Sequence, residues 1–148
     1  MIRPVVITAL AATALAGCAS EPPADQKFGQ LKVEQLNDAR FAVSVEAINV
    51  DGYELARCIA AAYTFAQRDD DGELLYPFYV RDGGKITDEF RKVDGKRQQT
   101  TRGVQTYSFA TAEEYVPYDH DGRDVMAVDQ QLATCEKQGL PTSLGGSS

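Results

Sequence analysis

His120 is the one histidine of the chain, and carboxylates lie beside it at Asp119, Asp121 and Asp124. An imidazole next to carboxylates can act as a general base or bind a divalent metal. A structural zinc site needs four ligands, however, and the chain has neither a Cys/His cluster nor a G-x-S-x-G nucleophile motif. An exposed loop histidine is therefore favoured, with a small hydrolase or metal-dependent enzyme centred on His120 as the alternative.

Two short acidic runs resemble fragments of a calcium-binding loop. They are Asp-Asp-Asp-Gly at 69–72 and Asp-His-Asp-Gly at 119–122. When each glycine is aligned with the sixth position of an EF-hand loop, the first acidic ligand and the closing glutamate are both missing. A solvated turn or a helix cap explains either run better than a calcium site does. We therefore predict no metal ligands and no catalytic residues.

A short apolar leader ends in Leu15-Ala16-Gly17-Cys18. Residues 4–16 carry no charge and follow Arg3. As a helix these thirteen residues would rise only about 20 Å, which is too short to cross a hydrocarbon core of about 30 Å. The pattern is typical of the apolar region of a signal peptide rather than of a membrane span.

The run at 15–18 resembles the lipobox of bacterial lipoproteins, with Cys18 as the lipid acceptor. The resemblance implies a signal peptide at 1–17, a covalent diacylglycerol and an N-linked acyl chain such as palmitate on Cys18, and no other cofactor. Ala19 in place of aspartate implies the outer membrane, with the domain facing the periplasm. The alternative is an ordinary secretory signal cut after Ala14-Leu15-Ala16.

Once Cys18 is lipidated, Cys58 and Cys135 remain. An exported compartment lets disulfides persist, so these two cysteines are expected to pair. The closed loop of about 78 residues would then remove about 4 to 5 kcal/mol of freedom from the unfolded chain. The alternative is two buried free thiols.

Charge is unevenly distributed along the mature chain of 131 residues, which is long enough for one domain. It has 14 basic and 22 acidic residues, a net charge of −8 that argues against nucleic acid as a partner. Residues 81–102 are different, with 7 basic and 4 acidic residues. Within them Lys96, Arg97 and Arg102 bracket a polar run, which is either a solvated hairpin or loop or a surface for a partner.

Period-two alternation predicts strands at 40–48 and 103–110. Residues 73–81 are interpreted as a further strand, with Pro77 placing it at a sheet edge or bulge. Asp82-Gly83-Gly84 is typical of a turn. A capping box at Asp51 and Glu54 predicts a helix over 52–68, and a second helix is expected over 123–138. The fold class is α+β: a two-layer sandwich of about three mostly antiparallel strands, with both helices on one face and joined by Cys58–Cys135.

We expect a flexible tether at 18–36, one domain at 37–139 and a disordered tail at 140–148. This plan resembles small bacterial envelope lipoproteins of unknown function. It predicts a binding or structural component of the envelope, not an enzyme, held on the membrane by its lipid. An envelope protein or a glycan would be the partner, and it would contact residues 81–102 or the strand that contains Pro77.

Overall fold

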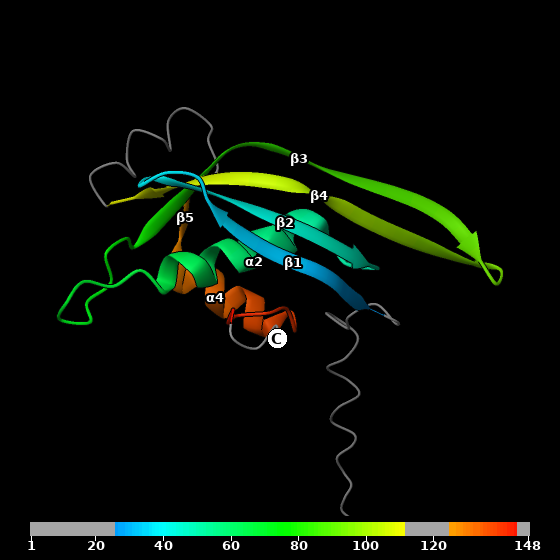
Figure 1. The fold of residues 1–148 in the computed structure, drawn as a ribbon. Helices are drawn as coiled ribbons and strands as arrows, with labels where there is room; N and C mark the ends of the chain where they lie inside the picture. Colours follow the sequence, from blue (N-terminus) through cyan, green and yellow to red (C-terminus); the bar gives the residue numbers. More distant parts are fainter. Residues whose placement is uncertain (1–25, 112–124, 145–148) are drawn as a thin grey trace, which may run out of the picture.

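The computed structural model describes residues 26–111 and 125–144, which form an antiparallel sheet with two helices on one side of it (Figure 1). The sheet has five strands in the order β1-β2-β4-β3-β5. The strands are β1 (Lys27–Gln35), β2 (Arg40–Ile48), β3 (Phe78–Val93), β4 (Lys96–Ala110) and β5 (Val125–Ala127). The helices are α2 (Gly52–Phe65) and α4 (Val128–Lys137).

The layers agree in part with the predicted two-layer α+β fold. α2 packs across the concave inner face of the curled sheet, against β1, β2, β3 and β4. α4 packs mainly on α2 and beside β5 (Figure 1). The prediction of about three strands was wrong, because β1 and the short β5 extend the sheet at its two edges. Both flanking strands lie in segments where the hydrophobic alternation is weak or brief.

The core lies between the inner face of the sheet and α2. Phe41, Val43, Val45 and Ala47 of β2 are all buried, as their alternation predicts. Leu55 and Ile59 of α2 meet them, and aromatic rings from β3 and β4 complete the layer: Tyr79, Tyr107 and Phe109. These rings are the largest apolar pieces available, since the chain has no tryptophan.

The start of α2 follows the predicted capping box only in part, and its end lies earlier than predicted. The Asp51 carboxylate accepts hydrogen bonds from the N–H groups of Tyr53 and Glu54, at 3.0 and 3.2 Å. The helix ends at Phe65 instead of 68. Phe65, its last residue, is 45 % exposed, and the Arg68 guanidinium lies 4.2 Å from the centre of its ring.

β3 corrects the prediction of a strand at 73–81 followed by a turn. The strand begins at Phe78, immediately after Pro77, and continues through Gly83 and Gly84 to Val93. The register with β4 shifts between Arg81 and Gly83, so Asp82 is the extra residue of a β-bulge. Gly84 has φ +91°, and a Cβ there would lie 2.3 Å from the carbonyl oxygen of Val104. The two glycines thus allow close approach of the strands rather than chain reversal.

Both predicted domain boundaries and the start of the last helix also need correction. β1 occupies residues 27–35, inside the stretch 18–36 that we expected to be tether. Leu140, the first residue of the predicted disordered tail, is only 8 % exposed, and it belongs to the hydrophobic core. α4 begins at Val128 rather than near residue 123, because β5 pairs with β3 immediately before it.

Candidate functional site

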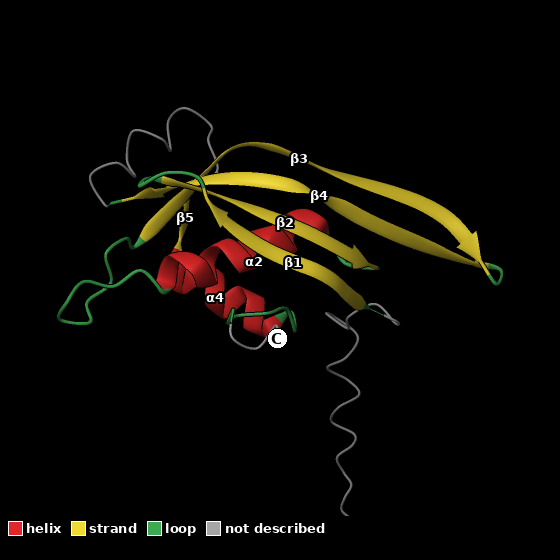
Figure 2. Cartoon of the chain, viewed as in Figure 1, coloured by secondary structure: helices red, strands yellow, loops and turns green. Residues whose placement is uncertain are grey.

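The candidate contact surface is the far end of the β3–β4 hairpin, residues 89–98, which we call the arm. Pairing of β2 with β4 ends at Ile48 and Thr100, and β5 pairs with β3 only over residues 78–80. Among the described residues, the strands of the arm therefore pair only with each other, and they extend beyond the rest of the sheet (Figure 2). Every residue from 89 to 97 is exposed.

A two-residue turn at Asp94 and Gly95 closes the arm. Both residues have positive φ, 55° and 80°. This combination is that of a type I′ hairpin turn, for which Asp-Gly is a favoured sequence. Val93 and Lys96 pair on either side of it, so the register is kept to the tip. Side chains along the arm therefore alternate between its two faces.

The side chains of the arm combine positive charge with exposed apolar surface. Its basic residues are Arg91, Lys92, Lys96 and Arg97, and its acidic residues are Glu89 and Asp94. Phe90 is 53 % exposed and Val93 is 40 % exposed. The Arg97 guanidinium lies 4.3 Å from the centre of the Phe90 ring, a cation–π contact between the two strands of the arm. Such a surface suits an anionic partner.

Polar contacts fix the base of the arm to the body. The buried Thr101 hydroxyl forms a hydrogen bond with the Asp88 carboxylate and lies 3.2 Å from the carbonyl oxygen of Val50. The N–H of Asn49 donates to the carbonyl of Gln99 at 2.8 Å, and the N–H of Gln99 donates to Oδ1 of Asn49 at 3.0 Å. The arm therefore leaves the sheet in a defined direction.

The structure separates the three basic residues that the sequence grouped. Lys96 and Arg97 lie in the arm, next to its tip. Arg102 lies on the body of the sheet, where its guanidinium pairs with the Glu46 carboxylate of β2 at 3.0 Å. The other members of the candidate contact surface are instead Arg91, Lys92, Phe90 and Val93, which the sequence alone did not single out. The Asp-Gly pair between two polar strands was the signal that could have found them.

Cys58 and Cys135 form a disulfide that joins α2 to α4, with 5.9 Å between their Cα atoms. Glu54 lies beside it and accepts hydrogen bonds from Nε2 of Gln131 at 2.9 Å and Nη1 of Arg57 at 3.0 Å. Within residues 26–111 and 125–144, Glu54 and these two cysteines are the only cluster with the spacing of metal ligands. Because the sulfurs are bonded to each other, the cluster offers a metal only the Glu54 carboxylate, which Arg57 and Gln131 already bind.

Tyr79 is a buried titratable group that the core holds neutral. Burial raises its pKa well above the ordinary value, and the nearby Tyr107 raises it further. Its hydroxyl donates to the carbonyl oxygen of Arg57 at 2.7 Å. The protonated phenol therefore forms a hydrogen bond that links β3 to α2. A pKa raised in this way is far from the value that a general acid or base needs near neutral pH.

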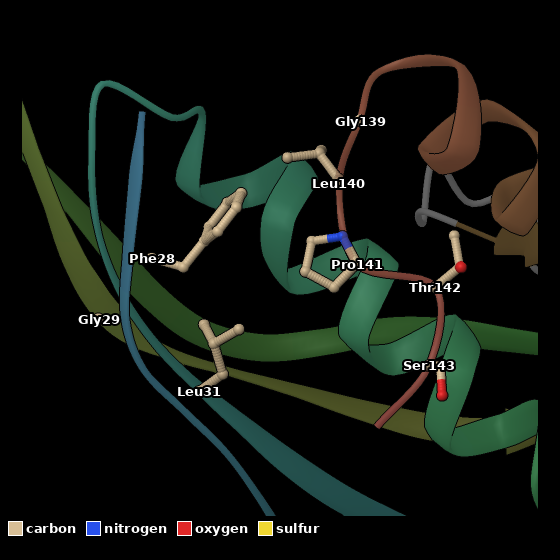
Figure 3. Close-up of a pocket in the computed structure, with 8 residues that line it drawn as sticks. All are labelled: Phe28, Gly29, Leu31, Gly139, Leu140, Pro141, Thr142 and Ser143. Carbon is tan, nitrogen blue, oxygen red and sulfur yellow. The ribbon is translucent and has the colours of Figure 1, made fainter. Parts of the chain in front are cut away.

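A pocket lies between the start of β1 and the segment after α4 (Figure 3). Its volume is about 520 Å³, and its walls are Phe28, Gly29 and Leu31 on one side and residues 139–143 on the other. Phe28 and Leu31 point from β1 toward Leu140 and Pro141 (Figure 3). None of the described residues that line it is titratable, so they supply no acid or base.

The other predicted chemical groups divide between a turn and the undescribed segments. The Asp69 carboxylate accepts hydrogen bonds from the N–H groups of Asp71 and Glu73, both at 2.9 Å, as the turn interpretation of 69–72 predicts. Cys18 lies outside the described residues. So do His120 and its neighbours Asp119, Asp121 and Asp124.

No protein-family model, no curated protein and no solved structure matches this chain. Neither helix in the described part of the chain has the length and apolar character needed to cross a membrane.

Proposed function

We propose that this protein is an outer-membrane lipoprotein, anchored through acyl chains on Cys18, whose periplasmic domain binds an anionic partner in the envelope through the arm. It works as a binding or structural component and not as an enzyme. The lipobox resemblance at 15–18 supports the anchor. The anionic character of the partner follows from the charge of the arm.

The observation that carries the proposal is the exposure of the arm. Its residues up to Arg97 are all exposed, so packing in the core does not explain why apolar and basic side chains are found there. A two-stranded ribbon has little stability of its own in water, yet here it extends beyond the sheet with Phe90 and Val93 facing solvent. Apolar and basic groups gathered on a protruding element are typical of a contact surface.

Site-specific photo-crosslinking in native envelopes tests the arm. A photoreactive residue in place of Lys92 is expected to give a specific adduct with an envelope component. Lys137, an exposed lysine at the end of α4, is the matched control position and is expected to give none. Equal adducts from both positions, or none from Lys92, would contradict an arm-mediated function.

The anchor is tested separately, by mass spectrometry and cell fractionation. The mature protein is expected to begin at Cys18, to carry acyl chains and to sediment with the outer membrane. Cys18→Ser is expected to lose the acyl mass and the membrane fractionation. An unmodified thiol at Cys18 in the wild-type protein would refute the anchor.

His120→Ala separates the binding proposal from the enzyme alternative. The Lys92 adduct is expected to be unchanged in this variant, because His120 is outside the arm. If His120→Ala abolished the cellular phenotype while the adduct and the fold persisted, the hydrolase or metal-enzyme alternative would replace the binding function.

A further inference from the structure

The base of the arm and the start of β1 lie in one row across the sheet. Lys27 pairs with Ile48, Ile48 with Thr100, and Thr100 with Glu89. β1 runs away from this row, so the strand begins at the same end of the sheet from which the arm protrudes (Figure 1). The start of β1 and the arm thus share one end of the domain.

The lengths of the two segments allow both to reach one surface. Nine residue steps separate Cys18 from Lys27, and at full extension they span at most about 30 Å. The arm extends four residue steps from Glu89 to Val93, about 13 Å at the rise of a β-strand, with the turn beyond. An anchor at Cys18 therefore leaves enough chain for the arm to touch the bilayer that holds the anchor.

The charges of the arm and of the body favour that orientation. The arm has four basic and two acidic residues, whereas the mature chain has 14 basic and 22 acidic. Outside the arm, acidic residues therefore outnumber basic ones two to one. An anionic surface attracts the arm and repels the body, which turns this end of the domain toward the membrane.

Building on the proposed function, we infer that the arm docks on the anionic phospholipid headgroups of the same bilayer that holds the Cys18 anchor. Phe90, Lys92 and Arg97 share one face of the arm, because Lys92 pairs with Arg97 and Phe90 lies two residues from Lys92 on the same strand. On this face Lys92 and Arg97 contact the phosphates, and the Phe90 ring, with Arg97 stacked on it, enters the boundary between headgroups and acyl chains, as aromatic residues do in interfacial segments. Arg91 and Lys96, on the opposite face, add to the positive charge of the arm. The anchor supplies the membrane attachment, and the arm sets the orientation.

A single tryptophan can report this contact, because the chain has none. Phe90→Trp places it in the arm. Leu75→Trp, at another exposed apolar residue in the loop between α2 and β3, is the matched control. The full mature lipoprotein carrying either tryptophan is reconstituted into vesicles of phosphatidylcholine alone or mixed equally with phosphatidylglycerol. Lipidation of Cys18 is verified by mass spectrometry beforehand.

Brominated lipid is expected to quench the fluorescence of the tryptophan in Phe90→Trp strongly in vesicles that contain phosphatidylglycerol and much less in vesicles of phosphatidylcholine alone. The emission maximum of this tryptophan should also shift to the blue only in the vesicles that contain phosphatidylglycerol. Leu75→Trp is expected to show no difference between the two. Replacing Lys92 and Arg97 with glutamine should reduce the ratio of docked to undocked protein about five-fold for each charge removed. The same replacements at Lys85 and Lys137, outside the arm, should leave it unchanged.

Equal quenching of Phe90→Trp in both kinds of vesicle, or quenching no greater than that of Leu75→Trp, would overturn the inference. If Phe90→Trp stays unquenched while the Lys92 adduct forms with an envelope protein, the lipid partner is wrong and the proposed function stands. If Cys18 of the purified protein carries no acyl chain, the proposed anchor fails, and this inference fails with it.

Discussion

The guanidinium of Arg40 on β2 forms a two-point ion pair with the carboxylate of Asp82, the bulged residue of β3. Nε lies 3.0 Å from Oδ2 and Nη2 lies 3.2 Å from Oδ1. The hydroxyls of Thr106 and Ser108 on β4 donate to the same two oxygens. The pair therefore links β2 to β3 across β4, and it fixes the extra residue of the bulge at the point where the register of β3 with β4 shifts.

Asp82→Asn is expected to lower the free energy of unfolding by about 1–2 kcal/mol at neutral pH, because the charge-assisted hydrogen bonds are lost. Burial alone would raise the pKa of Asp82, but the hydrogen bonds from Arg40, Ser108 and Thr106 outweigh it and lower the pKa below the ordinary 3.8. Because the pKa of Asp82 is lower in the folded protein than in the unfolded chain, the carboxylate stabilises the fold at pH values above 3.8. This stabilisation is lost as the pH falls through the pKa of the folded state. Urea unfolding of wild type and Asp82→Asn at a series of pH values from 7 to about 2 measures how much stability the carboxylate contributes.

Glu46→Gln is the control for this prediction. Its carboxylate forms an exposed ion pair with Arg102, which is expected to contribute less than about 0.5 kcal/mol. The acid-dependent loss of stability should shrink in Asp82→Asn and persist in Glu46→Gln. Equal pH profiles for wild type and Asp82→Asn would show that the carboxylate does not stabilise the bulge.

Gly84→Ala is expected to destabilise the sheet strongly. The new Cβ would meet the carbonyl oxygen of Val104 at 2.3 Å in a backbone conformation with φ +91°. Gly72 has a similar φ of +83°, and a Cβ added there would have no atom within 4 Å, so Gly72→Ala isolates the backbone strain from the clash. We expect a loss of about 1 kcal/mol for Gly72→Ala and about 3 kcal/mol or more for Gly84→Ala, measured by chemical denaturation. Equal losses of stability in the two variants would mean that β3 and β4 move apart to accommodate the new Cβ without losing free energy of unfolding.

The elements with strong local signals were predictable from the sequence, and those that depend on a neighbour were not. The alternation from Phe41 to Ala47 and the Asp51 cap located β2 and α2 closely. Asp82-Gly83-Gly84 has the composition of a turn, and only the approach of β4 shows that it is a bulge. β5 is three residues long and exists by pairing with β3.

The candidate site shows the same division. Net charge located the basic segment at 81–102, and spacing along the chain grouped Lys96 and Arg97 with Arg102. Only the strand register reveals that Arg102 belongs to the body of the sheet, where it pairs with Glu46. The same register shows that pairing with β2 ends at Thr100, so the arm consists of the residues between that point and the turn. Local composition therefore identifies the charged segment, and pairing between strands decides which of its residues protrude.

Loss of the disulfide is expected to destabilise the domain by about 2–4 kcal/mol, because Cys58 and Cys135 close a long loop of the unfolded chain. The double variant Cys58→Ala, Cys135→Ala should unfold at lower denaturant concentration and be insensitive to reductant. Wild type treated with dithiothreitol should shift to a similar midpoint. A thiol assay on unfolded, unreduced protein should detect no free thiol at these positions. Two titratable thiols would contradict the bond.

Shortening the arm is expected to leave the fold intact and to remove its binding. Deleting Arg91 and Lys92 from β3 together with Arg97 and Gln98 from β4 removes two residues from each strand, so the remaining side chains keep their faces and the Asp94-Gly95 turn is retained. Because the deleted side chains are not part of the core, the free energy of unfolding should change by less than about 1 kcal/mol.

Circular dichroism and denaturant unfolding measure the fold of the shortened protein, and quenching of the Phe90→Trp reporter in anionic vesicles measures docking. A loss of stability as large as that of Gly84→Ala would instead make the arm a structural part of the sheet, whereas retained docking would place the membrane contact elsewhere on the domain.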